Sequence, residues 1–210
     1  MARYIGPTCK LCRREGAKLF LKGEKCTTPK CPFSKRPYPP GMKGRFSSSK
    51  ASYYALQLRE KQKVKRIYGV LERQFKRYFK LASKSKGVTG RMLLQLLERR
   101  LDNVIFKLLF ALSRAQARQL VNHGFVFVNG RRVDIPSYLV KVNDKIEIKA
   151  PSSVIDVIRK NIETLSKERS LASWLFLDKE NLKAEVLRLP EKEDLAVPIN
   201  EQLIVELYSK

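Results

Sequence analysis

Acidic residues, histidine and long apolar runs are scarce in this sequence. Only 20 of its 210 residues are Asp or Glu, against 44 Lys and Arg, and it has one histidine. The longest unbroken apolar run, Leu108 to Leu112, is far shorter than the roughly 18 residues that a membrane-spanning helix needs. The first residues contain no apolar segment of the kind found in secretory signals. We therefore expect a cytoplasmic chain with no membrane role.

The excess of basic residues is concentrated in one part of the chain. The formal net charge is +24, and the isoelectric point is near 10.1. Residues 151–210 hold 9 basic and 11 acidic residues, whereas residues 1–150 hold 35 and 9. So large a positive charge would repel itself in a compact fold without a polyanion nearby, which predicts a nucleic-acid partner. With 43% hydrophobic residues, the chain can still bury one sizeable core or two smaller ones.

Four cysteines form two close pairs near the N-terminus. Two residues separate Cys9 from Cys12, four separate Cys26 from Cys31, and thirteen lie between the pairs. This spacing lets four thiolates converge on one ion, so it predicts a structural zinc site in a module with almost no core. An iron–sulfur cluster would use the same four ligands, and four unrelated buried thiols are the simplest alternative. A closed shell of four sulfurs has no position for substrate, so it implies no metal catalysis.

Glycine, proline and polar residues divide the chain into five predicted parts. We predict an α+β fold: a mostly helical domain with a loop-rich four-cysteine metal module at the N-terminus, and a helix–helix–hairpin domain with a small antiparallel sheet. The parts are a metal-binding module over residues 1–45, a basic helical domain over 46–90, a helix–hairpin module over 91–150, a mixed helical extension over 151–198, and a C-terminal tail over 199–210 that docks on the helical domain.

Two helical regions are expected before the hairpin. Apolar residues recur at helical spacing from Ser52 to about Ala82, between basic positions, with an interruption near Gly69. A second helix should begin at Thr89, because the apolar positions from Leu94 to Leu108 form one stripe. Basic side chains of both regions lie off the apolar faces, where a polyanion could reach them.

A short capped helix should follow. Ser113 and Gln116 are three residues apart, the spacing at which two side chains satisfy each other's backbone N–H groups in a capping box. The helix should extend from Arg114 to about His123 and end at Gly124, because glycine adopts the left-handed conformation that closes a helix.

The strand signals lie beyond this helix. Asn129-Gly130 between two short apolar segments is the strongest local signal for a type I′ hairpin. Ile146 and Ile148 alternate with charged residues and predict one more strand. A helix is expected from Pro151 to about Lys167, followed by mixed short elements.

The 114–123 helix is predicted to have a basic face. Arg114, Arg118 and Asn122 are spaced four residues apart, opposite Ala117 and Val121, so they should lie together and present guanidinium groups to phosphates. A solvated helix flank is the plain alternative, although the basic hairpin tip nearby favours binding. The predicted nucleic-acid contacts are Lys43, Arg45, Arg59, Lys61, Lys63, Lys65, Arg66, Arg99, Arg100, Arg114, Arg118, Asn122, His123, Asn129, Arg131 and Arg132.

No residue pattern predicts catalysis. The lone His123 lies at a predicted helix C-terminus, where the helix dipole favours an imidazole, and no Ser or Cys nucleophile is evident beside it. Asp102 is more typical of an ion-pair partner on a helix than of a catalytic acid. The chain is therefore expected not to be an enzyme and to have no small-molecule substrate.

Several runs resemble a known RNA-binding module. They are Leu97–Val104, Ser113–Gly124, Val128–Gly130 and Ile135–Tyr138. Together they resemble the module named after small-subunit ribosomal protein four, which also occurs in pseudouridine synthases, a tyrosyl-tRNA synthetase tail and a heat-shock RNA-binding protein. Four further runs resemble the family of that ribosomal protein itself: Tyr38–Gly41, Gln57–Val64, Ile67–Phe75 and Leu203–Lys210. The resemblance covers nearly the whole chain and is to a bacterial type with N-terminal zinc-binding cysteines.

The resemblance implies a function. It implies a structural constituent of the small ribosomal subunit that binds small-subunit rRNA as a primary binder and nucleates assembly. It also implies contacts with small-subunit proteins five and three near the place where mRNA enters, a contribution to translational accuracy and, in some bacteria, repression of the protein's own operon. Two enzymatic alternatives stay open: a pseudouridine synthase, in which a catalytic Asp follows Arg-Leu as Asp102 does here, and a metal-dependent RNA enzyme.

The chain departs from the family pattern in two places. Met42-Lys43 replaces a usual Gln-His, which keeps a cation for RNA, and Leu109 replaces a usual glycine, which puts the local packing between helices in doubt. Many relatives lack the cysteines, so the metal would aid folding and not the shared mechanism.

Overall fold

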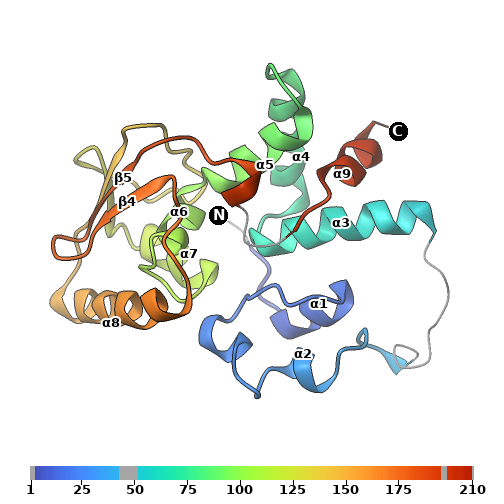
Figure 1. The fold of residues 1–210 in the computed structure, drawn as a ribbon, viewed down its shortest axis with the longest axis horizontal. Helices are drawn as coiled ribbons and strands as arrows, with labels where there is room; N and C mark the ends of the chain where they lie inside the picture. The colour runs from blue at the N-terminus through green and yellow to red at the C-terminus, as the bar shows by residue number, and fades with distance from the viewer. Residues whose placement is uncertain (1–2, 43–51, 195–197, 210) are drawn as a thin grey trace. The chain divides into compact units, whose positions relative to one another are not determined.

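The chain divides into two compact units. The computed structural model describes residues 3–42, 52–194 and 198–209 (Figure 1). Ala2–Leu93 and Ala196–Lys210 form one unit, the N-terminal unit, and Leu94–Leu195 form the other, the sheet unit. The predicted contacts Lys43 and Arg45 lie outside the described residues. No helix in the described ranges combines the length and the apolar character needed to cross a bilayer.

The N-terminal unit is built of short helices. They are α1 (Thr8–Glu15), the 3₁₀ helix η1 (Gly23–Cys26), α2 (Pro32–Lys35), α3 (Tyr53–Ile67), α4 (Glu72–Lys84) and α9 (Glu201–Tyr208), and α5 (Thr89–Glu98) begins here. Ser52 caps α3, since its hydroxyl accepts a hydrogen bond from the backbone N–H of Ala55. The interruption expected near Gly69 is confirmed: this residue has a φ of 62° in the turn between α3 and α4.

The C-terminal helix α9 packs against α3 and α4. Ile204 is fully buried, and the ring of Tyr208 stacks on Phe79 with centroids 4.4 Å apart. The Tyr208 hydroxyl donates a hydrogen bond to Glu72 at 3.0 Å. Burial and that carboxylate raise the pKa of Tyr208. The apolar end of the sequence is thus part of the core of the N-terminal unit.

The sheet unit places helices on one face of an antiparallel sheet. Its elements are α6 (Leu101–Lys107), α7 (Arg114–Asn122), β1 (Val126–Val128), β2 (Arg131–Arg132), β3 (Lys145–Ile148), α8 (Ser152–Glu168), β4 (Leu175–Asp178), β5 (Lys183–Val186) and the 3₁₀ helix η3 (Lys192–Asp194). The strand order is β2-β1-β3-β5-β4. The predicted hairpin, third strand and long helix are confirmed. The predicted mixed helical extension is wrong in part, because it contains strands β4 and β5.

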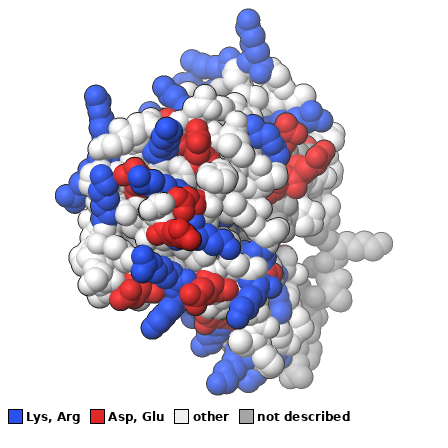
Figure 2. Space-filling view, turned by 60° about the vertical axis from the view of Figure 1, so that its left-hand side comes forward, with Lys and Arg blue, Asp and Glu red and all other residues white. Residues whose placement is uncertain are grey.

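Alternation along the strands separates a core face from an outer face. Val126 lies opposite Ile148 and Val128 opposite Ile146, and all four are buried against α6, α7 and α8 together with the fully buried Trp174. The intervening residues form the outer face. Figure 2 brings the side of Figure 1 that holds β4, β5 and α8 forward, and basic and acidic side chains are intermixed on it. The surface seen in Figure 2 is therefore not uniformly cationic.

The stripe from Leu94 to Leu108 belongs to two helices, not one as predicted. The chain leaves the helix at Arg99–Arg100, where Arg100 forms an isolated β-bridge with Leu139. The backbone N–H of Val140 donates to the carbonyl of Arg99 at 3.0 Å. Hydrogen bonds to a distant segment thus replace those that the next helical turn would have formed. The apolar periodicity continues across the break, since Leu94 and Leu97 of α5 and Leu101, Val104 and Ile105 of α6 are all buried.

Leu109 occupies a position suited to glycine. Its φ of 65° is left-handed, which costs roughly 1–2 kcal/mol for a residue with a Cβ. Its side chain is only 3% exposed and packs in the core of the sheet unit. The burial of the leucine side chain offsets that strain. The turn after α6 therefore forms with leucine at this position in place of the glycine.

Candidate nucleic-acid interface

Helix α7 begins and ends as its sequence predicts. The Ser113 hydroxyl accepts a hydrogen bond from the backbone N–H of Gln116. The Gln116 side chain caps the backbone N–H of Leu112 at 2.8 Å, one residue before the expected partner. Gly124 follows with a φ of 72°. The helix is therefore fixed at both ends, which orients the side chains along its length.

The predicted basic face of α7 is partly buried, which corrects the sequence interpretation. Arg118 is only 5% exposed, and its guanidinium lies 3.7 Å from the carboxylate of Asp102 on α6. Arg100 is fully buried and pairs with the same carboxylate at 2.6 Å. Two guanidinium groups thus share one buried carboxylate. Arg100 and Arg118 belong to the core and do not present their charges to a polyanion.

Arg114 and Arg99 lie at the margin of the sheet unit. Arg114 Nε donates to the side chain of Asn103 at 2.8 Å, and its guanidinium lies over the ring of Phe106. Arg99 Nε donates to the carbonyl of Val140 at 2.9 Å. Both are half-buried. Their positively charged groups are held in place by α6 and by the segment before β3.

The end of α7 and the hairpin form an exposed polar corner. Asn122, His123, Arg131 and Arg132 are all exposed. Arg132 donates to the carbonyl of His123 at 3.4 Å, and its guanidinium lies so close over Gly124 that a Cβ there would collide with it. Glycine is favoured here by its φ, and the guanidinium of Arg132 occupies the space that a Cβ would fill. The structure brings these four predicted contacts together.

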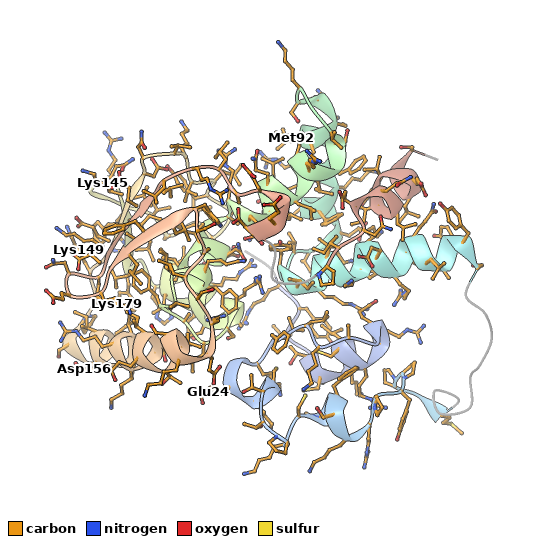
Figure 3. All side chains as sticks on the ribbon, in the orientation of Figure 1. Glu24, Met92, Lys145, Lys149, Asp156 and Lys179 are labelled. Atoms are coloured by element: carbon orange, nitrogen blue, oxygen red, sulfur yellow. The ribbon has the colours of Figure 1, made fainter. Side chains whose placement is uncertain are left out.

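Asn129 shapes the hairpin. Its φ is 50°, as the turn requires. Its side chain donates to Asp144 at 2.9 Å and accepts from the backbone N–H of Lys145 at 2.9 Å. Figure 3 shows the side chains of Lys145, at the start of β3, and Lys149, just after its end, projecting outward. The amide of Asn129 therefore holds the hairpin tip to the start of β3, a role that the sequence did not predict.

The predicted contacts of α3 have acidic partners within the N-terminal unit. Ion pairs join Arg59 and Arg66 to Glu15, Lys61 and Lys65 to Glu72, and Lys63 to Glu60. Burial alone would raise the pKa of Glu72, but hydrogen bonds from Lys61, Lys65 and Tyr208 lower it to about 2. Part of the charge of α3 therefore holds α1, α4 and α9 in place.

Helix α4 carries a cationic face that the predicted contact set omitted. The α4 stripe consists of Arg73, Lys76, Arg77, Lys80 and Lys84, which are all exposed. At 100° per residue they cover one side of the helix, opposite the buried Phe75, Tyr78 and Ala82. Within the part of the chain that the structure describes, none of the five takes part in an ion pair. The helical spacing of these basic residues is the sequence signal that could have found them.

The four cysteines lie in the small N-terminal helices. Cys9 and Cys12 are on α1, Cys26 ends η1, and Cys31 directly precedes α2. All are free thiols, and all but Cys9 are buried. Across residues 3–42 the only other buried residue is Leu19. This part of the chain therefore has almost no apolar core of its own.

The thiols are close enough to influence one another. Burial raises the pKa of Cys12, and the other three thiols add to the shift. Burial acts the same way on Cys31, but hydrogen bonds from the backbone N–H groups of Ser34 and Phe33 outweigh it and lower its pKa. As the described side chains are placed, no three Cys, His, Asp or Glu residues form a metal-ligand group. Four thiols in one short part of the chain are donors of the kind that bind zinc. Their side chains, however, are not arranged around a common point as metal ligands would be.

The fold and the exposed cations define the class of the protein. A capped helix, a tight hairpin and a small antiparallel sheet carry an exposed basic corner, and a second helical unit carries five unpaired cations within its described residues. Guanidinium and ammonium groups in such numbers match a phosphate backbone. This is the architecture of a basic α+β RNA-binding protein.

Comparisons with known proteins identify the family. Residues 3–98 match the ribosomal protein S4/S9 N-terminal domain, and residues 99–146 match the S4 domain. The chain is 57% identical to small ribosomal subunit protein uS4 of Thermus thermophilus and 58% identical to that of Dictyoglomus turgidum, in each case over 210 residues and 100% of both chains. The same protein of Thermodesulfovibrio yellowstonii is 57% identical over the same length. The chain belongs to the uS4 family.

Proposed function

We propose that the chain is a structural, non-catalytic constituent of the small ribosomal subunit that binds folded small-subunit rRNA. Full-length similarity to relatives that carry the uS4 name supports this proposal. The finer proposals are that it binds the rRNA early and nucleates assembly, contacts small-subunit proteins five and three where mRNA enters, and contributes to translational accuracy. These rest on the family resemblance of the sequence.

The α4 stripe is the observation that carries RNA binding. Five exposed cations on one helix face repel each other, and no acidic side chain among the described residues pairs with them to relieve this repulsion. A helix with such a face gains most from a polyanion that runs along it. The exposed corner of Asn122, His123, Arg131 and Arg132 supplies a second contact, suited to the groove of a folded RNA.

The enzymatic alternative loses its support in the sheet unit. Asp102, which a pseudouridine synthase would need in an open pocket, is only 3% exposed. Arg100 donates two hydrogen bonds to it, at 3.0 and 2.6 Å. A carboxylate held between guanidinium groups inside a core holds the helices together and does not face a substrate.

We further propose that Cys9, Cys12, Cys26 and Cys31 hold one structural zinc ion, with an iron–sulfur cluster as the alternative. Three of the four buried residues in the range 3–42 are cysteines. Backbone N–H groups already point at sulfur, as Lys22 N–H does at Cys26, 3.4 Å away. Such donors stabilise thiolates. A bound metal ion would supply the cross-link that holds residues 3–42 together.

Neutralising part of the α4 stripe should weaken rRNA binding and its dependence on salt. In the triple variant Arg73→Gln, Arg77→Gln, Lys80→Gln, the slope of log affinity against log salt should fall by roughly 2, at about 0.7–0.9 for each phosphate that the helix no longer neutralises. Filter binding to small-subunit rRNA over a range of salt concentrations measures this slope.

The matched control removes three exposed cations from α8: Arg159→Gln, Lys160→Gln, Lys167→Gln. Its slope should change far less, because none of these three residues belongs to a proposed RNA contact. Equal slopes for the two triple variants would show that net charge alone drives binding.

A further inference from the structure

Two arginines from different elements share one aromatic ring in the sheet unit. The guanidinium carbon of Arg114, at the start of α7, lies 4.4 Å from the centre of the Phe106 ring. That of Arg169, directly after α8, lies 4.2 Å from the same centre. The two guanidinium carbons therefore cannot be further apart than the sum of these distances. A buried phenyl ring thus contacts two like charges from different elements.

Arg169 is poorly satisfied by protein groups. One of its terminal nitrogens donates to the carbonyl of Ala111 at 3.3 Å. Its Nε is buried, and no acceptor lies within hydrogen-bond distance among the described residues. Burial and the neighbouring Arg114 lower the pKa of Arg169 to about 10, against weak opposition from Glu168. A buried donor without a partner costs free energy, which an added acceptor would recover.

Lys107 adds a third cation to the cluster. Burial lowers its pKa, Glu98 and Asp194 oppose the shift, and Arg114 and Arg169 add to it. Lys107 itself donates to the backbone carbonyl of Asp194 at 2.9 Å and lies 3.9 Å from the carboxylate of Glu98, which also accepts a hydrogen bond from Asn103. The charge of Lys107 is thus felt by both arginines, while Glu98 and Asp194 hold its ammonium group in place.

We propose that Arg114 and Arg169, with Lys107 beside them, bind one phosphate group of the rRNA backbone at the edge of the Phe106 ring. The proposal rests on the proposed function and adds Arg169 and Lys107 to the predicted contacts. A phosphate offers several acceptor oxygens, enough to accept from both guanidinium forks at once. The ring fixes the orientation of both forks before binding, so little side-chain freedom is lost.

A purely structural role of Arg169 predicts different experimental results from a phosphate-binding role. If Arg169 only fastens the end of α8 to α6 through Phe106, then phosphate should not perturb it, and its replacement should change stability alone. If it binds phosphate, it should respond to the free anion. Free phosphate and the RNA backbone share this chemistry, so one experiment uses each.

The first experiment titrates inorganic phosphate into the nitrogen-15-labelled full-length chain and follows the arginine Nε–H resonances by NMR. The resonances of Arg169 and Arg114 should shift saturably, and chloride at equal ionic strength should not reproduce the shift. The exposed Arg159 of α8 serves as the internal control. If Arg169 responds no more than Arg159, the proposed site is wrong.

The second experiment compares rRNA binding by Arg169→Met and Arg159→Met, which lose the same charge. Arg169→Met should bind about tenfold more weakly, with a salt slope lower by about 0.7–0.9, while Arg159→Met stays near wild type. Arg169→Lys should fall between them, since it keeps the charge and loses the fork.

The outcomes separate the site from the proposed function. Equal binding by the two Met variants, with strong binding by the wild type, overturns the site alone. A wild-type chain that does not prefer small-subunit rRNA overturns the proposed function, and the phosphate titration then still decides the site. If Arg169→Met proves unstable, the titration on the wild-type chain carries the test.

Discussion

Replacing Asp102 with Ala should lower the free energy of unfolding of the sheet unit by about 3–5 kcal/mol. The carboxylate is 3% exposed and pairs with Arg100 and Arg118, which are themselves buried. Without it, two buried guanidinium groups would lose the carboxylate that they share. This loss is a large fraction of the stability of an ordinary domain.

Urea unfolding followed by the fluorescence of Trp174 measures this effect. Trp174 is the only tryptophan of the chain and is fully buried in the sheet unit, so its emission reports that unit. Asp134→Ala is the matched control, because Asp134 is an exposed aspartate of the same unit. The control should change stability by less than about 0.5 kcal/mol. An equally small change in Asp102→Ala would show that the buried arginines do not depend on this carboxylate.

Replacing Cys9 and Cys12 together with Ser should release about one metal ion per chain and unfold residues 3–42. Structural zinc supplies on the order of 10–16 kcal/mol of apparent folding free energy to small modules. Here Leu19 is the only buried residue besides cysteines in that range, so little else can replace the metal. The unfolding midpoint reported by Trp174 should stay unchanged, since it lies in the other unit.

Metal content by elemental analysis and amide hydrogen exchange across residues 3–42 measure this outcome. The double variant Lys10→Ser, Lys30→Ser changes two exposed positions of the same module and should keep both metal and protection. Iron with acid-labile sulfide in place of zinc would identify the cluster alternative. Wild-type protein that carries no metal when purified without chelator would contradict the proposed site.

Local signals predicted much of the sheet unit. The cap at Ser113, the left-handed Gly124 and the Asn129-Gly130 turn depend on neighbouring residues only, and the structure confirms each. Strands β4 and β5 were not predicted, because they are short and β5 pairs with β3, far earlier in the chain. Their turn uses Asp178, whose carboxylate accepts from the backbone of Glu180, a weaker signal than Asn-Gly.

The burial of two predicted contacts could not be predicted from one helix. At 100° per residue Arg118 lies beside the apolar positions Ala117 and Val121, and this angle does not say where a neighbouring helix lies. In the fold α6 covers that side and brings Asp102 to Arg118. Because the apolar stripe continues past Arg100, the sequence predicts that this residue lies on the surface of a helix. In the structure its backbone instead forms a β-bridge with Leu139. Both errors arise from tertiary contacts that override local pattern.

The most direct test of specific rRNA recognition compares two RNAs. The affinity of the full-length chain for Mg²⁺-folded small-subunit rRNA should exceed its affinity for large-subunit rRNA by about 10³-fold or more at the same physiological salt concentration. The exposed corner of α7 and the hairpin is proposed to recognise a particular folded shape, whereas charge alone would bind both RNAs. Equal affinities for the two RNAs would contradict the claim that this chain is a specific small-subunit rRNA binder.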